Sequence, residues 1–173
     1  MPPSALNAAA SKKLVANRST RETVNFSVLD DHEICYLARS NSPRQVSVGF
    51  ERGARAPAHA VAPGPMLAGM LPEAELQSWV QRHKFTAFTA NTVTDPALFA
   101  QSARHARVIG YCIWEQRFEA GFNGVSTAVT DRRGRCHGAI GMTLPVSSWN
   151  RADIEQRLVP ALQDTAAAIR AVM

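Results

Sequence analysis

Hydrophobic and polar residues alternate along two parts of the chain, which is the pattern of strands with one buried face. Residues 24–28 and 34–38 alternate on either side of the polar pair Asp30-Asp31, and together they predict a hairpin. A short apolar run at Val46–Phe50 is a further strand candidate. Alternation returns in three later segments: residues 111–114, 122–130 and 136–144.

Helical spacing of apolar residues predicts helices between and after these strands. The expected helices are Pro65–Leu71, one that begins at Pro72, one between Asp95 and Gly110, and one that begins near Asn150 and continues to the end. In the third helix Asp95 is a cap, Pro96 suits the first turn and Gly110 suits a left-handed stop. Its expected inward residues are Leu98, Phe99, Ala103, Ala106 and Ile109. Pro160 is expected to kink or divide the last helix.

The order of these elements defines the fold class. Three strands, three helices, three strands and a final helix contain too few strand–helix–strand crossovers for a doubly wound parallel sheet. We therefore expect an α+β domain, an antiparallel sheet with helices packed on it. The 173 residues suit one domain, and 46% hydrophobic and 19% charged residues suffice for a packed core.

The last two strands are joined by residues 131–134, a tight turn with Asp first and Gly last. This turn predicts a register with Thr130 opposite Arg135. Carried along the strands, the register places small side chains on one face of the sheet: Gly124, Ser126, Ala139 and Gly141. Either a helix lies very close to this face, or a small ligand fills the space. The residues expected at the border of that space are Phe122, Trp114 and Thr143.

Charge, cysteines and hydropathy narrow the function. The net charge of +5 comes from scattered arginines without interleaved aromatic residues, so we expect a solvated basic surface rather than a nucleic-acid face. Three cysteines suit free thiols in a reducing compartment. No apolar run is long enough to span a bilayer, and the N-terminus does not resemble a secretory signal. We expect a cytoplasmic protein that does not contact membranes.

Motifs for catalysis, metals or nucleotides are weak. Cys136 and His137 are neighbours in a strand, so their side chains point to opposite faces and do not form a nucleophile–base pair. Cysteine and histidine spacings fit no zinc site, and Gly64 and Gly69 lack phosphate-loop spacing. We expect no catalytic residues, metal or cofactor. His59 lies in the turn beside the expected ligand space.

A set of short motifs in a consistent order resembles the effector-binding domain of IclR-type transcription regulators. The motifs are residues 24–30, 36–40, Gly53 with 57–60, 62–71, 71–73, Gly110-Tyr111, 119–122 and 131–134. The resemblance covers roughly residues 20 to 172. Residues 39–44 and 55–58 look most like the branch that senses aromatic acids such as protocatechuate or 4-hydroxybenzoate.

The resemblance implies a GAF/PAS-like domain that binds a small organic acid and transmits the event to an N-terminal winged helix-turn-helix outside this sequence. Residues 1–19 would be the remnant of a linker helix and residues 20–173 the effector-binding domain. The family also implies a homodimer or homotetramer that contacts DNA only through the winged helix-turn-helix, and no enzymatic activity.

Family pocket positions carry over onto residues of this sequence: Ala56, Ala62, Pro63, Trp114, Phe122, Gly124, Gly141 and Thr143. Several differ from the usual family residue, since Trp114 replaces an acidic residue, Gly124 a cysteine and Arg117 a glutamate. These changes favour a larger, flatter or more apolar effector than a glyoxylate-sized acid. For its carboxylate we expect donors at the helix start after Pro63, where Gly64 permits close approach, and at Thr143 and His59.

Two other functions remain open from the residues. The first is a free-standing GAF-like enzyme with a reactive pocket thiol, which would be Cys112 or Cys136. Alternation along the strand places Cys136 on the opposite face from Gly141, which is an argument against this enzyme function. The second is a dimerisation module whose pocket is filled, with Trp114 as the plug.

Overall fold

The computed structural model describes residues 20–42 and 49–173. The expected linker helix at residues 1–19 lies outside the described residues, and so does most of the strand candidate Val46–Phe50. The α+β class is confirmed, and the elements follow in the expected order with one exception. The third strand of the described chain is Arg55–Pro57, where no strand was expected, because three residues are too few to show an alternating pattern.

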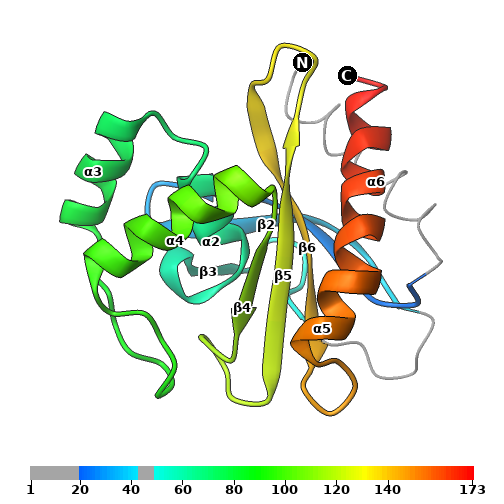
Figure 1. Cartoon of the computed structure of the whole chain (residues 1–173), viewed down its shortest axis with the longest axis horizontal. Helices are drawn as coiled ribbons and strands as arrows, with labels where there is room; N and C mark the ends of the chain where they lie inside the picture. Colours follow the sequence, from blue (N-terminus) through cyan, green and yellow to red (C-terminus); the bar gives the residue numbers. More distant parts are fainter. Residues whose placement is uncertain (1–19, 43–48) are drawn as a thin grey trace.

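An antiparallel sheet forms the centre of the molecule (Figure 1). Its strands are β1 (Val24–Asp30), β2 (Glu33–Ser40), β3 (Arg55–Pro57), β4 (Cys112–Glu115), β5 (Phe122–Thr130) and β6 (Cys136–Pro145). Their order across the sheet is β3-β2-β1-β6-β5-β4, and each neighbouring pair is antiparallel. The first hairpin, β1–β2, is therefore joined to the last one through the β1–β6 pair.

Helices cover both faces of the sheet, as Figure 1 shows with α2 to α4 on one side and α5 and α6 on the other. The first layer contains η1 (Ala58–Ala60), α2 (Pro63–Ala68), α3 (Glu73–Arg82) and α4 (Pro96–Ile109). The second contains α5 (Arg151–Asp153), the π-helical turn η2 (Ile154–Leu158) and α6 (Val159–Arg170). Within the described ranges no helix is long and apolar enough to cross a membrane.

Each face of the sheet has its own apolar core. Alternation along β1 directs Val24 and Phe26 toward α6, where they pack with Leu158, Leu162 and Ile169. On the opposite face Tyr36, Trp114 and Ala139 belong to the core formed with α2, α3 and α4. The sheet therefore separates two hydrophobic layers, and the small-residue face belongs to the layer of α2.

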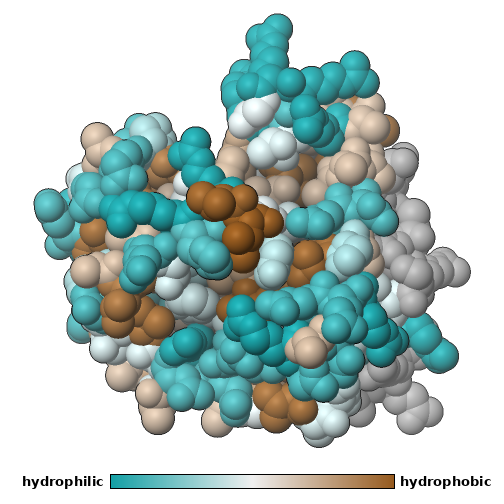
Figure 2. All heavy atoms as spheres, viewed as in Figure 1, coloured by the Kyte–Doolittle hydropathy of each residue, from teal (hydrophilic) through white to brown (hydrophobic). Residues whose placement is uncertain are grey.

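The expected signals of α4 are confirmed at both ends. The Asp95 side chain accepts a hydrogen bond from the Ala97 N–H at 2.8 Å, and Gly110 ends the helix with φ of 84°. The inward position of Leu98 is wrong, because its side chain is 54% exposed. Phe99 and Ala103 define the buried stripe, and Leu98 lies one residue, about 100°, away from it. Figure 2 shows hydrophobic side chains gathered near the centre of the view, over the end of α4.

The last helix begins and divides as expected. The Asn150 side chain accepts a hydrogen bond from the Asp153 N–H at 2.9 Å and so caps α5. Pro160 lies in the first turn of α6, and the preceding turn, η2, is π-helical. A proline has no N–H to donate, which accounts for the break in the regular ladder before it.

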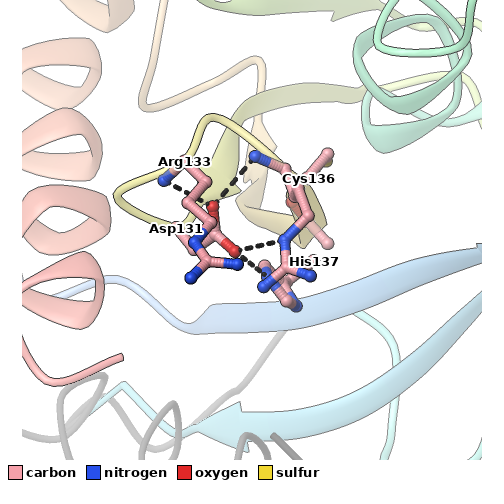
Figure 3. Close-up of polar contacts among 6 residues, drawn as sticks. Asp131, Arg133, Cys136 and His137 are labelled. Atoms are coloured by element: carbon pink, nitrogen blue, oxygen red, sulfur yellow. Dashed lines mark hydrogen bonds and ion pairs between the residues drawn. The ribbon is translucent and has the colours of Figure 1, made fainter.

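The register expected for the β5–β6 hairpin is wrong by two residues. Ser126 pairs with Gly141 and Gly124 with Thr143, because a bulge lies between Val129, which pairs with Gly138, and Thr130, which pairs with Cys136. Asp131 closes the turn by accepting hydrogen bonds from the Arg133 N–H and from the His137 ring (Figure 3). These bonds and Arg135 hold the Asp131 pKa well below its usual range, with the His137 contact as the largest cause.

The two-residue shift has one consequence for each face. A shift by an even number leaves side chains on the same face, so the small-residue face persists. On the turn side of the bulge, however, the alternation of faces along β6 is reversed. Cys136 therefore packs with Ala128 against the core on the α2 side. The expectation that Cys136 lies on the opposite face of the sheet from Gly141 is therefore wrong.

Candidate functional site

A cavity of about 140 Å³ lies between the sheet and the segment that connects η1 with α2. Its floor is formed by residues of β1, β2, β5 and β6: Asn25, Ser27, Tyr36, Gly124, Gly141 and Thr143. Residues 60–63 form one wall, and Trp114 with Arg117 forms another. Phe50 and Phe118 also line the cavity, from the loops outside the sheet.

The small-residue face explains both a close approach and an open space. A Cβ atom on Gly124 would lie 2.9 Å from the Ala62 Cβ, and the Ser126 hydroxyl donates to the Ala62 carbonyl at 2.9 Å. The chain before α2 therefore touches the sheet at β5. A Cβ atom on Gly141 would meet the Val125 carbonyl at 2.6 Å. One segment therefore packs closely on this face, as the first alternative expected, and a cavity lies beside it. That a small ligand fills this cavity stays a prediction.

Aromatic rings give the cavity rigid walls. Tyr36 and Phe50 are stacked with ring centroids 4.3 Å apart, and burial raises the Tyr36 pKa. The Trp114 indole Nε1 donates to the His59 carbonyl at 2.9 Å, which ties β4 to η1. The Arg117 guanidinium carbon lies 5.1 Å from the centre of the Trp114 ring, within the range of a cation–π contact. Trp114 is thus part of a wall beside an open space and does not plug it.

Seven of the ten expected ligand-binding residues lie on the cavity wall: Ala62, Pro63, Trp114, Phe122, Gly124, Gly141 and Thr143. The other three, Ala56, His59 and Gly64, do not. Ala56 is fully buried in the core that contains α2. A Cβ atom on Gly64 would lie 1.5 Å from the Ala58 carbonyl, so the close approach at Gly64 is with η1 rather than with a ligand.

His59 is turned toward other histidines. Its Nδ1 lies 2.6 Å from His83 Nε2, and its Nε2 lies 2.8 Å from the Thr86 carbonyl oxygen. His83 Nδ1 in turn lies 3.0 Å from His32 Nδ1. Burial lowers the pKa of His59, and burial together with the neighbouring histidines lowers the pKa of His83 to about 4. His59 is therefore a member of a neutral imidazole chain and not a group on the cavity wall.

The expected carboxylate donors at the start of α2 are not available. Pro63 and Pro65 have no N–H, and the Gly64 N–H donates to the Val61 carbonyl at 3.0 Å. The helix start contributes apolar surface to the cavity instead. Thr143 is the one expected donor that the structure places on the wall.

Unpartnered polar atoms at the cavity escaped the sequence analysis. Among the described residues, four buried side-chain atoms have no hydrogen-bond partner: Asn25 Oδ1, Ser27 Oγ, Arg117 Nε and Asn123 Oδ1. All four residues line the cavity. A buried polar atom without a partner costs about 1–3 kcal/mol, so such atoms are rare unless an occupant satisfies them. A molecule that fills the cavity would therefore need polar groups to pair with these atoms as well as apolar surface to contact the aromatic walls.

Reactive thiols and metal ligands are not part of this cavity. Burial raises the pKa of the Cys112 thiol to about 12 and also raises that of Cys136, and neither residue lines the cavity. A thiol with a raised pKa is a poor nucleophile. Across residues 20–42 and 49–173 no group of three metal-ligating side chains converges. These findings give no support to the pocket-thiol function.

An antiparallel sheet with a walled cavity under a short helix defines the class of protein, a small-molecule-binding α+β domain. The chain matches the family model described as "Bacterial transcriptional regulator IclR C-terminal" over residues 8–171. It belongs to the IclR family of transcription regulators, as the effector-binding C-terminal domain.

Two named relatives of the chain are also regulators of transcription. The chain is 28% identical over 142 residues to the Pca regulon regulatory protein of Pseudomonas putida, and the match covers 82% of this chain and 49% of the relative. It is 26% identical over 156 residues to the p-hydroxybenzoate hydroxylase transcriptional activator of Acinetobacter baylyi, covering 87% and 58%. The chain thus spans about half the length of these curated relatives.

Solved structures show the same fold. A transcriptional regulator of Rhodococcus sp. RHA1 superposes with a TM-score of 0.92 at 27% identity, covering 96% of this chain and 68% of that one. The inducer-binding domain of a PobR double mutant from Acinetobacter, in complex with 3-hydroxybenzoic acid, superposes with a TM-score of 0.89 at 25% identity, covering 96% and 98%.

Proposed function

We propose that this chain senses a small carboxylic acid built on one aromatic ring and thereby controls a transcription regulator. The cavity carries the proposal, because it combines aromatic walls with buried polar atoms that have no partner. Its volume of about 140 Å³ is close to that of an engineered cavity of roughly 150 Å³ that binds benzene. A single aromatic ring fits that space.

Two relatives support the aromatic class. One similar structure contains 3-hydroxybenzoic acid, and one similar protein is an activator of p-hydroxybenzoate hydroxylase. The ligand of a relative does not transfer by fold alone. The matching size and the polar groups of the cavity are the reasons for assigning the same class here.

The acid acts by population shift. An effector that binds one arrangement of the assembled domains more tightly increases the share of that arrangement. The regulator is a cytoplasmic homodimer or homotetramer, and it contacts DNA through a winged helix-turn-helix outside this chain. No cofactor or catalytic step is required. Light scattering of the purified chain with and without acid tests the assembly, and a strictly monomeric chain contradicts this part of the proposal.

A thermal-shift screen tests the ligand class. The panel contains benzoate, 3-hydroxybenzoate, 4-hydroxybenzoate, cyclohexanecarboxylate and acetate. A ligand at about 100 times its Kd stabilises the native state by about 2.7 kcal/mol, which raises the Tm by about 5–10 °C for a chain of this size. We expect such a rise with at least one aromatic acid and none with acetate.

Two matched variants link the thermal shift to the cavity. Thr143→Phe places a ring into the cavity from the floor and should abolish the shift. Thr130→Phe, on the neighbouring strand and outside the cavity wall, should preserve it. No shift with any aromatic acid in the unaltered chain, or an equal shift in Thr143→Phe, contradicts the proposed function.

A further inference from the structure

The floor of the cavity contains two buried polar side chains, each with an oxygen atom that has no hydrogen-bond partner. Asn25 and Ser27 alternate with Val24 and Phe26 on β1 and face the cavity side of the sheet. Their neighbours across the β1–β6 pair are Gly141 and Ala139, which carry no polar side-chain atom. On the β2 side their neighbours are Arg39 and Tyr36. Neither neighbour satisfies Asn25 Oδ1 or Ser27 Oγ, although Asn25 and Ser27 are only 4% and 1% exposed.

The opposite wall contains one buried donor in the same condition. Arg117 follows β4, and its guanidinium lies over the Trp114 ring while one terminal nitrogen donates to the Asn91 carbonyl. These contacts fix the side chain and leave Nε buried without a partner. Among the described residues, no carboxylate lies within ion-pair distance of Arg117. Glu119 lines the cavity as well, but it is exposed.

The fourth unpartnered atom belongs to a different environment. The Asn123 amide nitrogen donates to the Trp149 carbonyl at 3.4 Å, and Trp149 belongs to the core on the α6 side. Neighbours along a strand face opposite sides, so Asn123 is turned away from the side on which Gly124 faces the cavity. The two polar ends of the cavity are thus the Asn25–Ser27 pair and Arg117.

The chemistry of these ends defines a ligand. A guanidinium N–H pairs best with an anionic oxygen. An amide oxygen only accepts, whereas a serine hydroxyl both donates and accepts, so a ligand hydroxyl, which also does both, suits the pair. β1 and β4 are three strand positions apart, roughly 14 Å at about 4.8 Å a step, which leaves room for one ring between their side chains.

We propose that Arg117 binds the carboxylate of a ring acid and that Asn25 with Ser27 reads a hydroxyl on the same ring. The assignment rests on the proposed function and adds the residues that determine specificity. With these contacts the cavity binds hydroxylated aromatic acids more tightly than the unsubstituted acid. The hydroxyl donates to Asn25 Oδ1 and accepts from the Ser27 hydroxyl, while the carboxylate accepts from Arg117 Nε.

Calorimetry with matched ligands and variants tests this assignment on the full chain. The probes are 3-hydroxybenzoate, 4-hydroxybenzoate, benzoate and benzamide. The unaltered chain should bind one hydroxybenzoate about 5- to 10-fold more tightly than benzoate, the usual effect of one or two hydrogen bonds. In Ser27→Ala this preference should fall to less than about 2-fold, while benzoate affinity stays unchanged.

Arg117→Met tests the other end. It should weaken binding of all acids about 10- to 100-fold, the range for a lost hydrogen bond to a charged group, and it should abolish the preference for benzoate over benzamide. Arg132→Met, an exposed arginine in the β5–β6 turn, is the matched control and should change neither preference. Ser147→Ala, an exposed serine, is the control for Ser27→Ala.

The outcomes separate the two proposals. If no aromatic acid binds the unaltered chain, the proposed function fails and this assignment fails with it. If acids bind but Ser27→Ala weakens benzoate and the hydroxybenzoates equally, or Arg117→Met retains the preference for acid over amide, only the assignment is overturned. Folding does not obscure the result, because Ser27 Oγ has no hydrogen-bond partner within the protein and its removal should leave the Tm without added acid unchanged or higher.

Discussion

Trp114 holds the cavity wall together through one hydrogen bond. Its indole N–H donates to the buried His59 carbonyl at 2.9 Å. Trp114→Phe keeps most of the ring surface but leaves that carbonyl without its indole donor. We expect the free energy of unfolding in urea to fall by about 1–3 kcal/mol. An unchanged urea midpoint with an unchanged slope would mean that the bond contributes little to the fold.

Thr143 is the expected polar residue that does lie on the cavity wall. Thr143→Val keeps the shape and removes the hydroxyl, so we expect an acid that binds the cavity to lose about 5-fold in affinity by calorimetry. Thr130→Val, outside the cavity, is the control and should bind as the unaltered chain does. Equal affinities for Thr143→Val and the unaltered chain would remove Thr143 from the ligand contacts.

Residue types alone did not reveal the polar ends of the cavity. In the sequence Asn25 and Ser27 are the polar members of an alternating strand, which is also how a solvent-exposed face appears. Only the sheet order shows that β1 is covered on both faces. Arg117 was noted as a departure from its family and not as a site residue, because its burial depends on the stacking with Trp114 and the contact with Asn91.

At the scale of elements, the packing of α2 on η1 depends on Gly64. A Cβ atom at this position would overlap the Ala58 carbonyl carbon and oxygen, at 2.4 and 1.5 Å. Gly64→Ala must displace backbone, and we expect it to destabilise the domain by more than about 3 kcal/mol or to prevent folding. Gly121→Ala, where no atom lies within 4 Å but φ is +89°, should cost only about 1 kcal/mol in thermal or urea unfolding.

Three histidines connect the β1–β2 turn, η1 and the residue after α3 through a chain with one consistent proton arrangement. His59 Nε2 donates to the Thr86 carbonyl, so His59 Nδ1 accepts from His83 Nε2. His83 Nδ1 then accepts from His32 Nδ1. His32 Nε2, at the outer end, lies 3.6 Å from the Asp31 carboxylate. The inner two rings are neutral in this arrangement, and protonating His83 breaks it.

This chain makes stability depend on pH. The His83 pKa of about 4 lies below its ordinary value of 6.5, so between these values the unfolded chain binds a proton that the folded chain does not. The free energy of unfolding therefore falls as the pH decreases through this range, by less than about 1.4 kcal/mol per pH unit for this group. Urea unfolding from pH 7 to 4 should show a smaller decrease in His83→Leu. Parallel pH curves for the two proteins would contradict the assignment.

The elements show what local pattern can predict. Caps and stop residues placed α4 correctly, since those signals act within one helical turn. The register of the β5–β6 hairpin was wrong because the bulge between Val129 and Thr130 depends on the Asp131 contacts with Arg135 and His137. Alternation along a strand contains no information about such a bulge. The small-residue face was predictable only because the error was an even number of residues.

At the scale of the molecule, the sheet separates the layer that contains the cavity from a layer that packs on its other face. The cavity contacts β1, β5, β6 and the start of α2, while α6 packs on the other face. Hydrogen exchange with a bound aromatic acid should therefore slow in residues 60–70 and 112–126 and change little in residues 159–170. Acetate is the control ligand. Equal slowing in both layers would mean that the acid stabilises the whole domain rather than this cavity.

The glycines on the floor of the cavity and the loop residues that line it differ in how well they tolerate new side chains. At Gly124 and Gly141 even one added carbon meets Ala62 or the Val125 carbonyl, so these positions resist change. Phe50, Arg117 and Phe118 come from loops and are only partly buried. A mutant library aimed at a biosensor for a new acid should therefore vary Phe50 and Phe118, keep Arg117 for the carboxylate and leave the glycines constant. We expect natural substitutions at the same loop positions to change ligand preference without loss of the fold.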